Sequence, residues 1–500
     1  TFTHFFINIS LILNIFIFLL GISIFFRKNF FDKKFLSKKF IYLSILIVLI
    51  PIFISQKYHE DFGYYHLPYA LLLLEEKIIF GIANTNIAFV YNSIWLNIYP
   101  SFFLPDNNYN FLTLSSLILF IVLVIYLIDN VLKDNEWCLS KLYSILIIFY
   151  FILKFTRISE YGVDLPSVIY ANLSILYFIK FFETNNTNYR KNYFFLNLCF
   201  SFFSILIKLS SIPILLLTII LYFKNFKILK KSIFEFKFLF IYFLSALFFV
   251  QQFIYTGCLI YPSQLSCLNV GWFDQDFVSL TSVLEVTNKS YSQAQEFMTQ
   301  EEFLKNFNWL PFWFERNYPE IINHISTMMI PFVICYLYLI KKKQTNVFKF
   351  YKLRLYLLIF VILSLIFWLT FSPVYRFGIT FFMTAVLLLL SNFFSNKKIT
   401  KNLFMAILGL CLLFNFSKNI NRILNNDKIY FGTQNIKNNY VLDDKNSLDS
   451  SKIFFVDVEK NKFNGWQGRL CWDIPIICSY SDVELEKKRN YLLIKKRKKD

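Results

Sequence analysis

The sequence has little of what a water-soluble protein of 500 residues needs. Charged residues make up only 17% of the chain, glycine occurs 11 times and proline 12 times, whereas hydrophobic residues make up 56%. A soluble protein of this length needs far more polar surface to cover its core, so the composition excludes an ordinary soluble domain. The mean hydropathy is +0.50, and the recurring apolar runs are long enough to cross about 30 Å of hydrocarbon as helices.

These apolar runs predict an all-α polytopic membrane protein with about 12 transmembrane helices. In lipid every backbone polar group must be paired within the protein, which a helix achieves within one segment. The two short spans on either side of Lys208 predict a hairpin whose second helix starts near Pro213. The predicted spans lie at residues 5–26, 40–56, 111–128, 142–155, 166–182, 193–206, 211–223, 236–256, 325–340, 355–371, 378–394 and 403–416.

The net charge of +19 is spread over short loops between the apolar runs, which argues against a nucleic-acid partner. Basic loops of membrane proteins face the cytoplasm, so loop charge predicts the orientation. The basic loops lie at residues 27–39, 180–191, 224–237, 341–354 and 397–401. The loops assigned to the outer face carry less positive charge and lie at residues 57–110, 156–165, 257–324, 372–377 and 418–500.

The alternation of basic and less basic loops predicts that the chain has two parts, a transmembrane core and a C-terminal domain. Residues 1–417 form a transmembrane core with long extracytoplasmic loops at 57–110 and 257–324, and residues 418–500 form a small C-terminal extracytoplasmic domain. Both termini then lie outside; the basic end at 487–499 opposes this placement, but charges far from a span carry little topological weight. The expected location is the plasma membrane, the inner membrane of a bacterium, with the site facing the periplasm or the exterior.

Cysteine occurs 8 times, and half of these residues form two local pairs in segments assigned to the outer face. Cys258 and Cys267 form one pair, and Cys471 and Cys478 form the other. Local even pairing in an oxidising compartment favours disulfides. Metal binding is an alternative, although no nearby His or second Cys pair completes a zinc set, and four free thiols are the remaining interpretation.

The first outer loop carries an acidic motif in Tyr58-His-Glu-Asp-Phe-Gly-Tyr-Tyr-His-Leu-Pro-Tyr69, directly after the second predicted span. Glu60 and Asp61 are adjacent carboxylates, and His59 and His66 are two of the 4 histidines in the chain. Such a cluster suits acid–base chemistry or a divalent cation close to lipid. An interfacial aromatic belt would explain the tyrosines equally well, but it requires no acids.

Other ionisable residues lie close to the bilayer on the same predicted face. Arg157, Glu160 and Asp164 fall between two predicted spans, Lys208 at the hairpin tip, and Arg376 in a turn between two further spans. Ionisable groups at membrane depth usually mark a pathway or a site, and Arg and Lys both hold phosphate well. Contact with lipid headgroups explains any single one of the basic residues equally well. Their occurrence together with the acidic motif favours a shared site.

On these features the chain resembles the C-type (GT-C) membrane glycosyltransferases, which include protein mannosyltransferases, aminoarabinose transferases and oligosaccharyltransferase subunits. The shared features are many spans, an acidic motif that opens a long outer loop, and a hairpin of short helices with an outward Lys. Members usually carry the acidic motif after their first span, whereas here it follows the second, which fits an extra helix before the core. Within the superfamily the chain looks most like a group of bacterial multi-pass membrane proteins without an assigned substrate, through Glu60-Asp61-x-x-Tyr-Tyr-His-Leu-Pro68, Lys208-Leu-Ser-Ser, Tyr261-Pro262, Arg376-Phe-Gly378 and Cys471-Trp-Asp-Ile-Pro-Ile-Ile-Cys478.

The resemblance implies an enzyme that takes a sugar from a polyprenyl-phosphate carrier in the membrane and passes it to a glycan, lipid or protein acceptor at the outer face. Asp61 would be the general base for the acceptor hydroxyl, and Glu60 would assist it or bind a metal together with Asp61. Relatives differ in their use of a divalent cation such as Mg²⁺ or Mn²⁺, so a metal cofactor stays open. The substrate and its leaving phosphate, which needs fixed positive partners, would be bound by Arg157, Lys208, Arg376, His59, His66, Glu160 and Asp164.

Two other classes of membrane protein remain compatible with the sequence. A polysaccharide polymerase or ligase also handles lipid-linked sugars, but it relies on Arg-rich outer loops, and the outer loops here hold few Arg. A transporter or flippase of lipid-linked glycans would carry charged or broken helices at mid-depth, often in two related halves, and the sequence has no convincing internal repeat. A purely structural role would leave the acidic motif unexplained.

Overall fold

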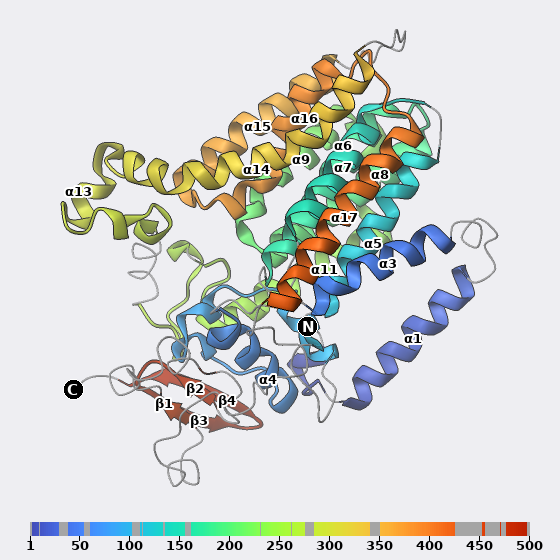
Figure 1. The fold of residues 1–500 in the computed structure, drawn as a ribbon. Helices are drawn as coiled ribbons and strands as arrows, with labels where there is room; N and C mark the ends of the chain where they lie inside the picture. Colours follow the sequence, from blue (N-terminus) through green and yellow to red (C-terminus); the bar gives the residue numbers. More distant parts are fainter. Residues whose placement is uncertain are drawn as a thin grey trace.

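The protein is mainly helical in the computed structural model (Figure 1). Figure 1 shows most of the long helices as an upper layer, with α1 lower at the right, and with the helix α4 (Leu67–Glu75) and the C-terminal strands beneath that layer. The structure describes residues 3–9, 11–29, 39–54, 61–102, 111–112, 114–133, 136–155, 162–230, 232–261, 263–275, 285–340, 351–425, 453–455, 471 and 477–497.

Each predicted span overlaps a helix. These helices are α1 (Leu11–Asn29), α3 (Lys39–Ile54), α5 (Leu114–Leu132), α6 (Leu139–Lys154), α7 (Asp164–Glu183), α8 (Thr187–Ile207), η8 (Leu209–Ile214) with α9 (Leu215–Lys224), α11 (Phe236–Thr256), α14 (Leu310–Leu339), α15 (Tyr351–Phe371), α16 (Tyr375–Phe393) and α17 (Lys401–Asn425). The mainly helical fold is therefore confirmed, and it is consistent with a multi-pass membrane protein, whereas the count of about 12 spans stays a prediction. Within the described ranges, seven helices are long and apolar enough to cross a membrane, at 114–132, 164–183, 236–256, 310–339, 352–371, 375–393 and 401–425.

The observed helices α8 and α17 extend beyond the spans predicted at 193–206 and 403–416. The largest difference between a predicted span and the observed helix lies at 325–340. The span predicted at 325–340 belongs to α14, which begins at Leu310. The first half of α14 contains Glu315, Arg316 and Glu320, whose charges lower the local hydropathy and hide the helix from a search for apolar runs. The outer loop predicted at 257–324 is therefore shorter than expected and ends before Leu310. Further short helices among the described residues are η1 (Thr3–Phe5), α10 (Phe226–Leu229), η9 (Ser232–Phe234), η10 (Gln264–Ser266), η11 (Tyr291–Gln293), α13 (Gln300–Leu304) and η12 (Lys305–Phe307).

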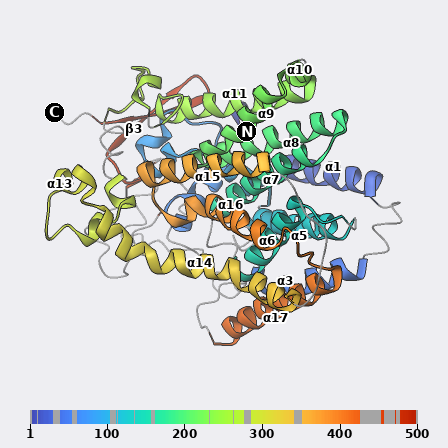
Figure 2. The same ribbon diagram turned by 90° about the horizontal axis from the view of Figure 1, so that it is seen from above.

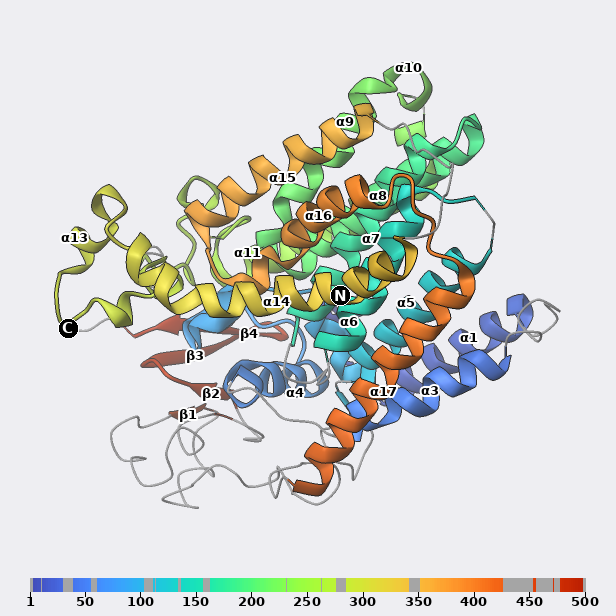
Figure 3. The same cartoon turned by 45° about the horizontal axis from the view of Figure 1, so that its top comes forward.

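The core is centred on α6. Every residue of this helix from Leu139 to Ile152 is buried, because α6 packs against α5, α7, α14, α16 and α17. Figure 2 shows α6 enclosed by its neighbours, and Figure 3 shows α17 running on past α6 towards α3, against which it also packs. From Ile145 to Ile152 the residues of α6 are aliphatic or aromatic, as expected of a helix enclosed by protein on all sides.

Buried polar side chains join α7, α8 and α9. Asn197 Nδ2 donates a hydrogen bond to Ser174 Oγ at 2.8 Å, and Thr218 Oγ1 donates to Asn197 Oδ1 at 2.8 Å. Because lipid offers no hydrophobic driving force between helices, small residues and such hydrogen bonds hold membrane helices together. This network fixes α7 relative to α8, and the ends of these two helices carry Asp164 and Lys208.

The lower layer is the assembly of residues 61–102 with residues 477–497. Residues 61–102 form α4 and the short helices η2 (Phe62–His66), η3 (Ile82–Asn84), η4 (Ile87–Val90) and η5 (Leu96–Phe102). The strand β3 (Val483–Lys488) pairs antiparallel with β4 (Tyr491–Lys496), so that Val483 faces Lys496. The short strands β1 (Ile453–Phe455) and β2 (Ile477–Ser479) pair in parallel, with Ile453 opposite Ile477.

Backbone hydrogen bonds attach the C-terminal hairpin to the first loop. Phe80 N donates to Leu492 O at 3.0 Å, and Ile494 N donates to Phe80 O at 2.9 Å. Gly81 follows with a φ of +72°, and a Cβ atom there would come within 2.2 Å of Ile494 O, so this close approach requires glycine. Both predicted disulfides are confirmed, with S–S lengths of 2.03 Å for Cys258–Cys267 and 2.01 Å for Cys471–Cys478.

Candidate functional site

Three of the predicted site residues form one ionic cluster around Asp164. Lys208 Nζ pairs with Asp164 Oδ1, and Arg376 Nε lies 3.2 Å from Asp164 Oδ2. The Asp164 side chain is 10% exposed, that of Lys208 21% and that of Arg376 42%, so the carboxylate is the most enclosed member. Buried charges are stable only when they are paired, which explains why two cations share this carboxylate.

The three residues meet because each occupies the end of a helix. Asp164 is the first residue of α7, Lys208 caps the C-terminus of α8, and Arg376 is the second residue of α16. A carboxylate is favoured at a helix N-terminus and a cation at a C-terminus, whereas a cation at an N-terminus is disfavoured. Arg376 is therefore in the unfavourable position, and its contact with Asp164 compensates for it.

A pocket opens beside this cluster. Ser167 Oγ and Ser211 Oγ lie 2.9 Å apart in its wall. Lys208 Nζ also lies 3.5 Å from the ring centroid of Phe377, a cation–π contact. The pocket thus offers cations, hydroxyl groups and an aromatic face, and it is lined by Asp164, Ser167, Val168, Lys208, Ser210, Ser211, Arg376, Phe377, Thr380 and Phe381.

Two indole groups hold the turn that presents Arg376. Trp313 Nε1 donates to Pro373 O at 2.6 Å, and Trp368 Nε1 donates to Val374 O at 2.8 Å. Both tryptophans are almost fully buried. Phe377 N also donates to Val374 O at 3.0 Å. The indole bonds add to this backbone bond and fix the backbone just before Arg376. The sequence analysis missed both residues, because nothing in their spacing connects them with the turn.

Asp61 belongs to the same electrostatic environment. It stands immediately before η2 and interacts electrostatically with both Lys208 and Arg376. Burial lowers the pKa of Lys208 to about 8, although the neighbouring Asp164 works against this decrease. Burial also raises the pKa of the Tyr65 phenol well above its ordinary value, and Asp61 and Asp164 add to that increase. The acidic motif and the basic residues of separate loops therefore lie together.

His66 connects the first loop to the start of α7. The side chain of His66 is 5% exposed. Gly162 has a φ of +47°, and a Cβ atom there would lie 2.4 Å from His66 Cε1. Only glycine fits both this backbone conformation and this contact. His66 therefore packs beside the cluster rather than lining the pocket, which leaves its predicted role in substrate binding a prediction.

The remaining predicted site residues are His59, Glu60, Arg157 and Glu160, and all four lie outside the described residues. In the described part of the chain, no three His, Cys, Asp or Glu residues group so as to hold a metal ion. Asp164 uses both carboxylate oxygens to contact cations, so the residues described do not form a donor set for a divalent ion. The metal predicted at Glu60 and Asp61 stays a prediction.

A second polar group adjoins Arg376, and the sequence analysis missed it. His324 Nδ1 lies 2.8 Å from Tyr150 Oη, and the rings of His324 and Tyr375 are 4.2 Å apart. Glu320 Oε1 lies 3.8 Å from His324 Nε2 and interacts electrostatically with Arg376. The sequence does contain a pattern that indicates this group: His324 is one of 4 histidines, and it follows Glu320 by one helical turn.

The C-terminal segment reaches the Asp61 side of the site. The rings of Tyr480 and Tyr64 are 5.0 Å apart, and Tyr480 N donates to Thr85 O at 2.8 Å. The next residue, Asn86, donates through Nδ2 to Tyr64 O at 2.9 Å. The Thr85–Asn86 turn therefore holds both Tyr480 and the helical turn that follows Asp61.

Comparison with known proteins gives one match. A family model described as Domain of unknown function (DUF8201) matches residues 1–383, which include Asp61, Asp164, Lys208 and Arg376. The described part of the C-terminal hairpin lies beyond the matched range. No curated protein and no solved structure matches the chain.

Proposed function

The chain belongs to the family described as Domain of unknown function (DUF8201), and we propose that it is a membrane glycosyltransferase. It moves a sugar from a polyprenyl-phosphate-linked donor to a glycan, lipid or protein acceptor. The observation that supports this proposal is that Lys208 and Arg376 line a pocket at the ends of apolar helices, while Asp61 interacts electrostatically with both cations. A general base and two cations for a leaving phosphate are the groups that such a transfer requires.

Each residue has a separate role in the proposed reaction. Asp61 accepts the proton of the acceptor hydroxyl while the hydroxyl oxygen forms a bond to the anomeric carbon of the donor sugar. The bond between that carbon and the phosphate oxygen breaks, and its electron pair leaves with the lipid phosphate. Lys208 and Arg376 stabilise the charge that develops on this oxygen. Asp164 holds the two cations in place and acts as a positioning residue.

We further propose that the site faces away from the cytoplasm. The helix ends opposite the cluster carry basic residues, among them Lys180 in the last turn of α7 and Lys224 in the last turn of α9. An excess of Lys and Arg is typical of the cytoplasmic side. Two disulfides belong to the segments on the cluster's side, which fits an oxidising compartment.

The proposal is tested with membranes that contain the protein and a labelled polyprenyl-phosphate sugar. Asp61→Asn removes the base and keeps the shape, so transfer should fall by about 10²-fold or more. Asp482→Asn is the matched control, because Asp482 is an exposed carboxylate of the C-terminal hairpin whose partner is Arg497. Unchanged transfer by a correctly inserted Asp61→Asn protein would refute the role of Asp61 as base.

The same assay separates the competing classes. A transporter or flippase would move the labelled lipid across the membrane without forming a glycosylated product. A polysaccharide polymerase would extend its product through many cycles, whereas the proposed enzyme adds a single sugar. The cluster lies at helix ends rather than at mid-depth, where a transporter usually binds its substrate. The transferase is therefore the function that these contacts favour.

A further inference from the structure

The disulfide-closed loop Cys258–Cys267, which follows α11, carries an apolar surface. Leu259 and Ile260 are each 44% exposed, Leu265 is 101% exposed and Leu268 is 57% exposed. We call these four side chains the apolar tip. The residues between the two cysteines include no Asp, Glu, Lys or Arg. Large apolar side chains gathered at one exposed place without charge mark a contact surface.

The loop is held in one conformation by its own bonds. Besides the disulfide, Leu259 N donates to Ser266 O at 3.0 Å and Ile260 N donates to Ser266 Oγ at 2.9 Å. Tyr261 points the other way: it is 2% exposed, and its ring lies 5.4 Å from the ring of Tyr91. One side of the loop is thus anchored in the protein while the apolar tip is presented outward, so contact with a partner requires little ordering of the chain.

The position of the loop identifies the partner. The helix α11 has 21 residues, which at 1.5 Å per residue span about 31 Å and match a hydrocarbon core of about 30 Å. The loop begins directly after this helix, at the depth where hydrocarbon gives way to headgroups. Phe240 and Phe243 of α11 are 54% and 51% exposed, as expected of a surface that faces lipid.

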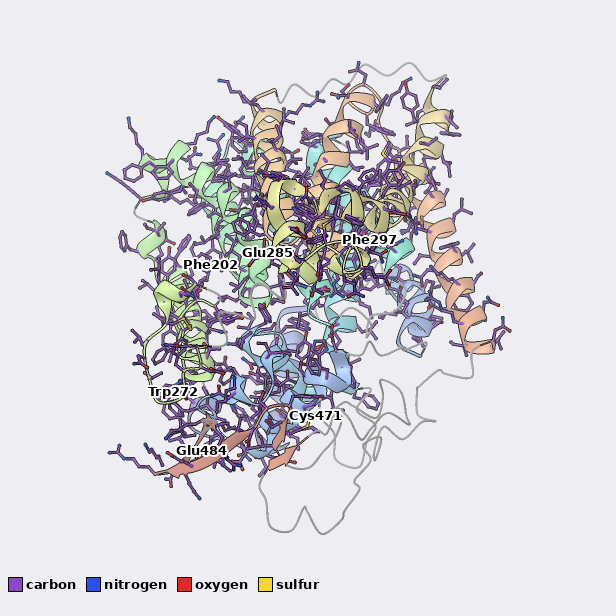
Figure 4. All side chains as sticks on the ribbon, turned by 90° about the vertical axis from the view of Figure 1, so that its left-hand side faces the viewer. Phe202, Trp272, Glu285, Phe297, Cys471 and Glu484 are labelled. Atoms are coloured by element: carbon purple, nitrogen blue, oxygen red, sulfur yellow. A yellow bond between two sulfur atoms is a disulfide. The ribbon has the colours of Figure 1, made fainter. Side chains whose placement is uncertain are left out.

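A tryptophan marks the same depth. Trp272 Nε1 donates to Phe253 O at 3.3 Å, in the last turn of α11. Figure 4 shows Trp272 at the edge of the molecule, between the helices and the layer that contains Glu484. Tryptophan is enriched at the boundary of a bilayer because its ring is apolar and its N–H is polar. Trp272 therefore supports placing the loop at that boundary.

From these observations we infer that the apolar tip inserts into the bilayer boundary and anchors the lower layer to the membrane surface. The occupant of this surface is lipid, at the level of the headgroups and the first acyl carbons. The disulfide and the hydrogen bonds of the loop hold it in one conformation, so the tip enters lipid without unfolding. This role does not depend on the proposed transferase activity.

The inference is tested with nitroxide labels on the whole protein in lipid nanodiscs. The free cysteines Cys138, Cys199, Cys335 and Cys411 are first replaced by alanine. Single labels are then placed at Leu265→Cys, at Phe243→Cys on the lipid-facing side of α11, and at Glu484→Cys on the exposed edge of β3. Collision rates with oxygen, which dissolves in lipid, and with a water-soluble nickel chelate report the surroundings of each label. Monodisperse protein after labelling shows that each variant has folded.

The expected result is that the Leu265 label behaves like the Phe243 label. Its collision rate with the nickel chelate should be about tenfold or more below that of the Glu484 label, a factor that corresponds to 1.4 kcal/mol of exclusion from water. A Leu265 label as accessible to nickel as the Glu484 label would overturn the inference. A Leu265 label protected from both reagents and broadened by a second label would also overturn it, because the tip would then contact another copy of the chain.

Discussion

The proton on Lys208 should control how transfer depends on pH. Burial lowers the pKa of Lys208 to about 8, so the side chain loses its charge in a range where ordinary lysines keep theirs. Neutral Lys208 cannot stabilise a leaving phosphate. We therefore expect the rate of transfer to fall as pH rises through about 8 in the wild-type protein. The substitution Lys208→Arg keeps the positive charge to much higher pH and should remove this decrease.

The size of the effect follows from the pKa. With a pKa of about 8, roughly nine tenths of the molecules carry charged Lys208 at pH 7 and roughly one tenth at pH 9. The rate at saturating acceptor should thus fall by about tenfold between these two pH values. Lys208→Arg should lose at most a small part of its own rate over the same range.

As pH rises, the contribution of Lys208 to the free energy of unfolding should increase, whereas the rate of transfer should decrease. Between about 8 and the ordinary value of 10.5, the unfolded chain binds a proton at Lys208 that the folded protein lacks. The free energy of unfolding therefore rises with pH across this window. At 1.36 kcal/mol for each pH unit, the full window corresponds to roughly 3 kcal/mol as an upper bound. Because activity falls while stability rises, loss of activity at pH 9 cannot be attributed to unfolding.

The assay measures transfer of labelled sugar from pH 6.5 to 9.5, with thermal unfolding of the same samples in detergent as the second measurement. Wild type and Lys208→Arg are compared at each pH. A flat wild-type profile up to pH 9.5 would contradict the reasoning. The same would hold if Lys208→Arg lost activity in parallel with wild type, because another group would then titrate.

Three further substitutions test the contacts around the cluster. Gly162→Ala places a Cβ atom 2.4 Å from His66 Cε1 and should lower the unfolding free energy by about 2 kcal/mol or more, measured by thermal melting. Trp368→Phe removes the donor to Val374 O and should cost about 1 kcal/mol and reduce transfer. The control Trp137→Phe removes a similar bond to Phe394 O and should leave transfer unchanged. Tyr480→Ala should lower transfer because its ring contact with Tyr64 is lost, whereas Tyr480→Phe should retain most of it; equal activity of the two variants would refute a positioning role.

The convergence of the charged residues follows from helix order, which the sequence reveals. Apolar runs and loop charge predict antiparallel neighbours, so turns that are separated along the chain return to the same face. Asp164, Lys208 and Arg376 each occupy such a turn, and the structure brings them into contact. The two disulfides were predictable for a similar reason, since their partners are only 9 and 7 residues apart.

Contacts between distant segments were not predictable from composition or periodicity. Tyr480 and Tyr64 come from opposite ends of the chain, and no repeat or charge pattern links them. The need for glycine at position 162 arises from the His66 ring packed against it, which is a property of the folded protein. The indole bonds of Trp313 and Trp368 likewise depend on where two helices cross the turn before Arg376.

The way Asp164 is shared explains how one carboxylate can organise a phosphate site without blocking it. Arginine has five N–H donors and lysine three. Asp164 Oδ2 lies 3.2 Å from Arg376 Nε, one of these donors. Lys208 Nζ pairs with Asp164 Oδ1 and lies over the ring of Phe377. Asp164 thus contacts one donor group of each cation, while the carboxylate offsets the repulsion between the two positive charges and fixes their spacing.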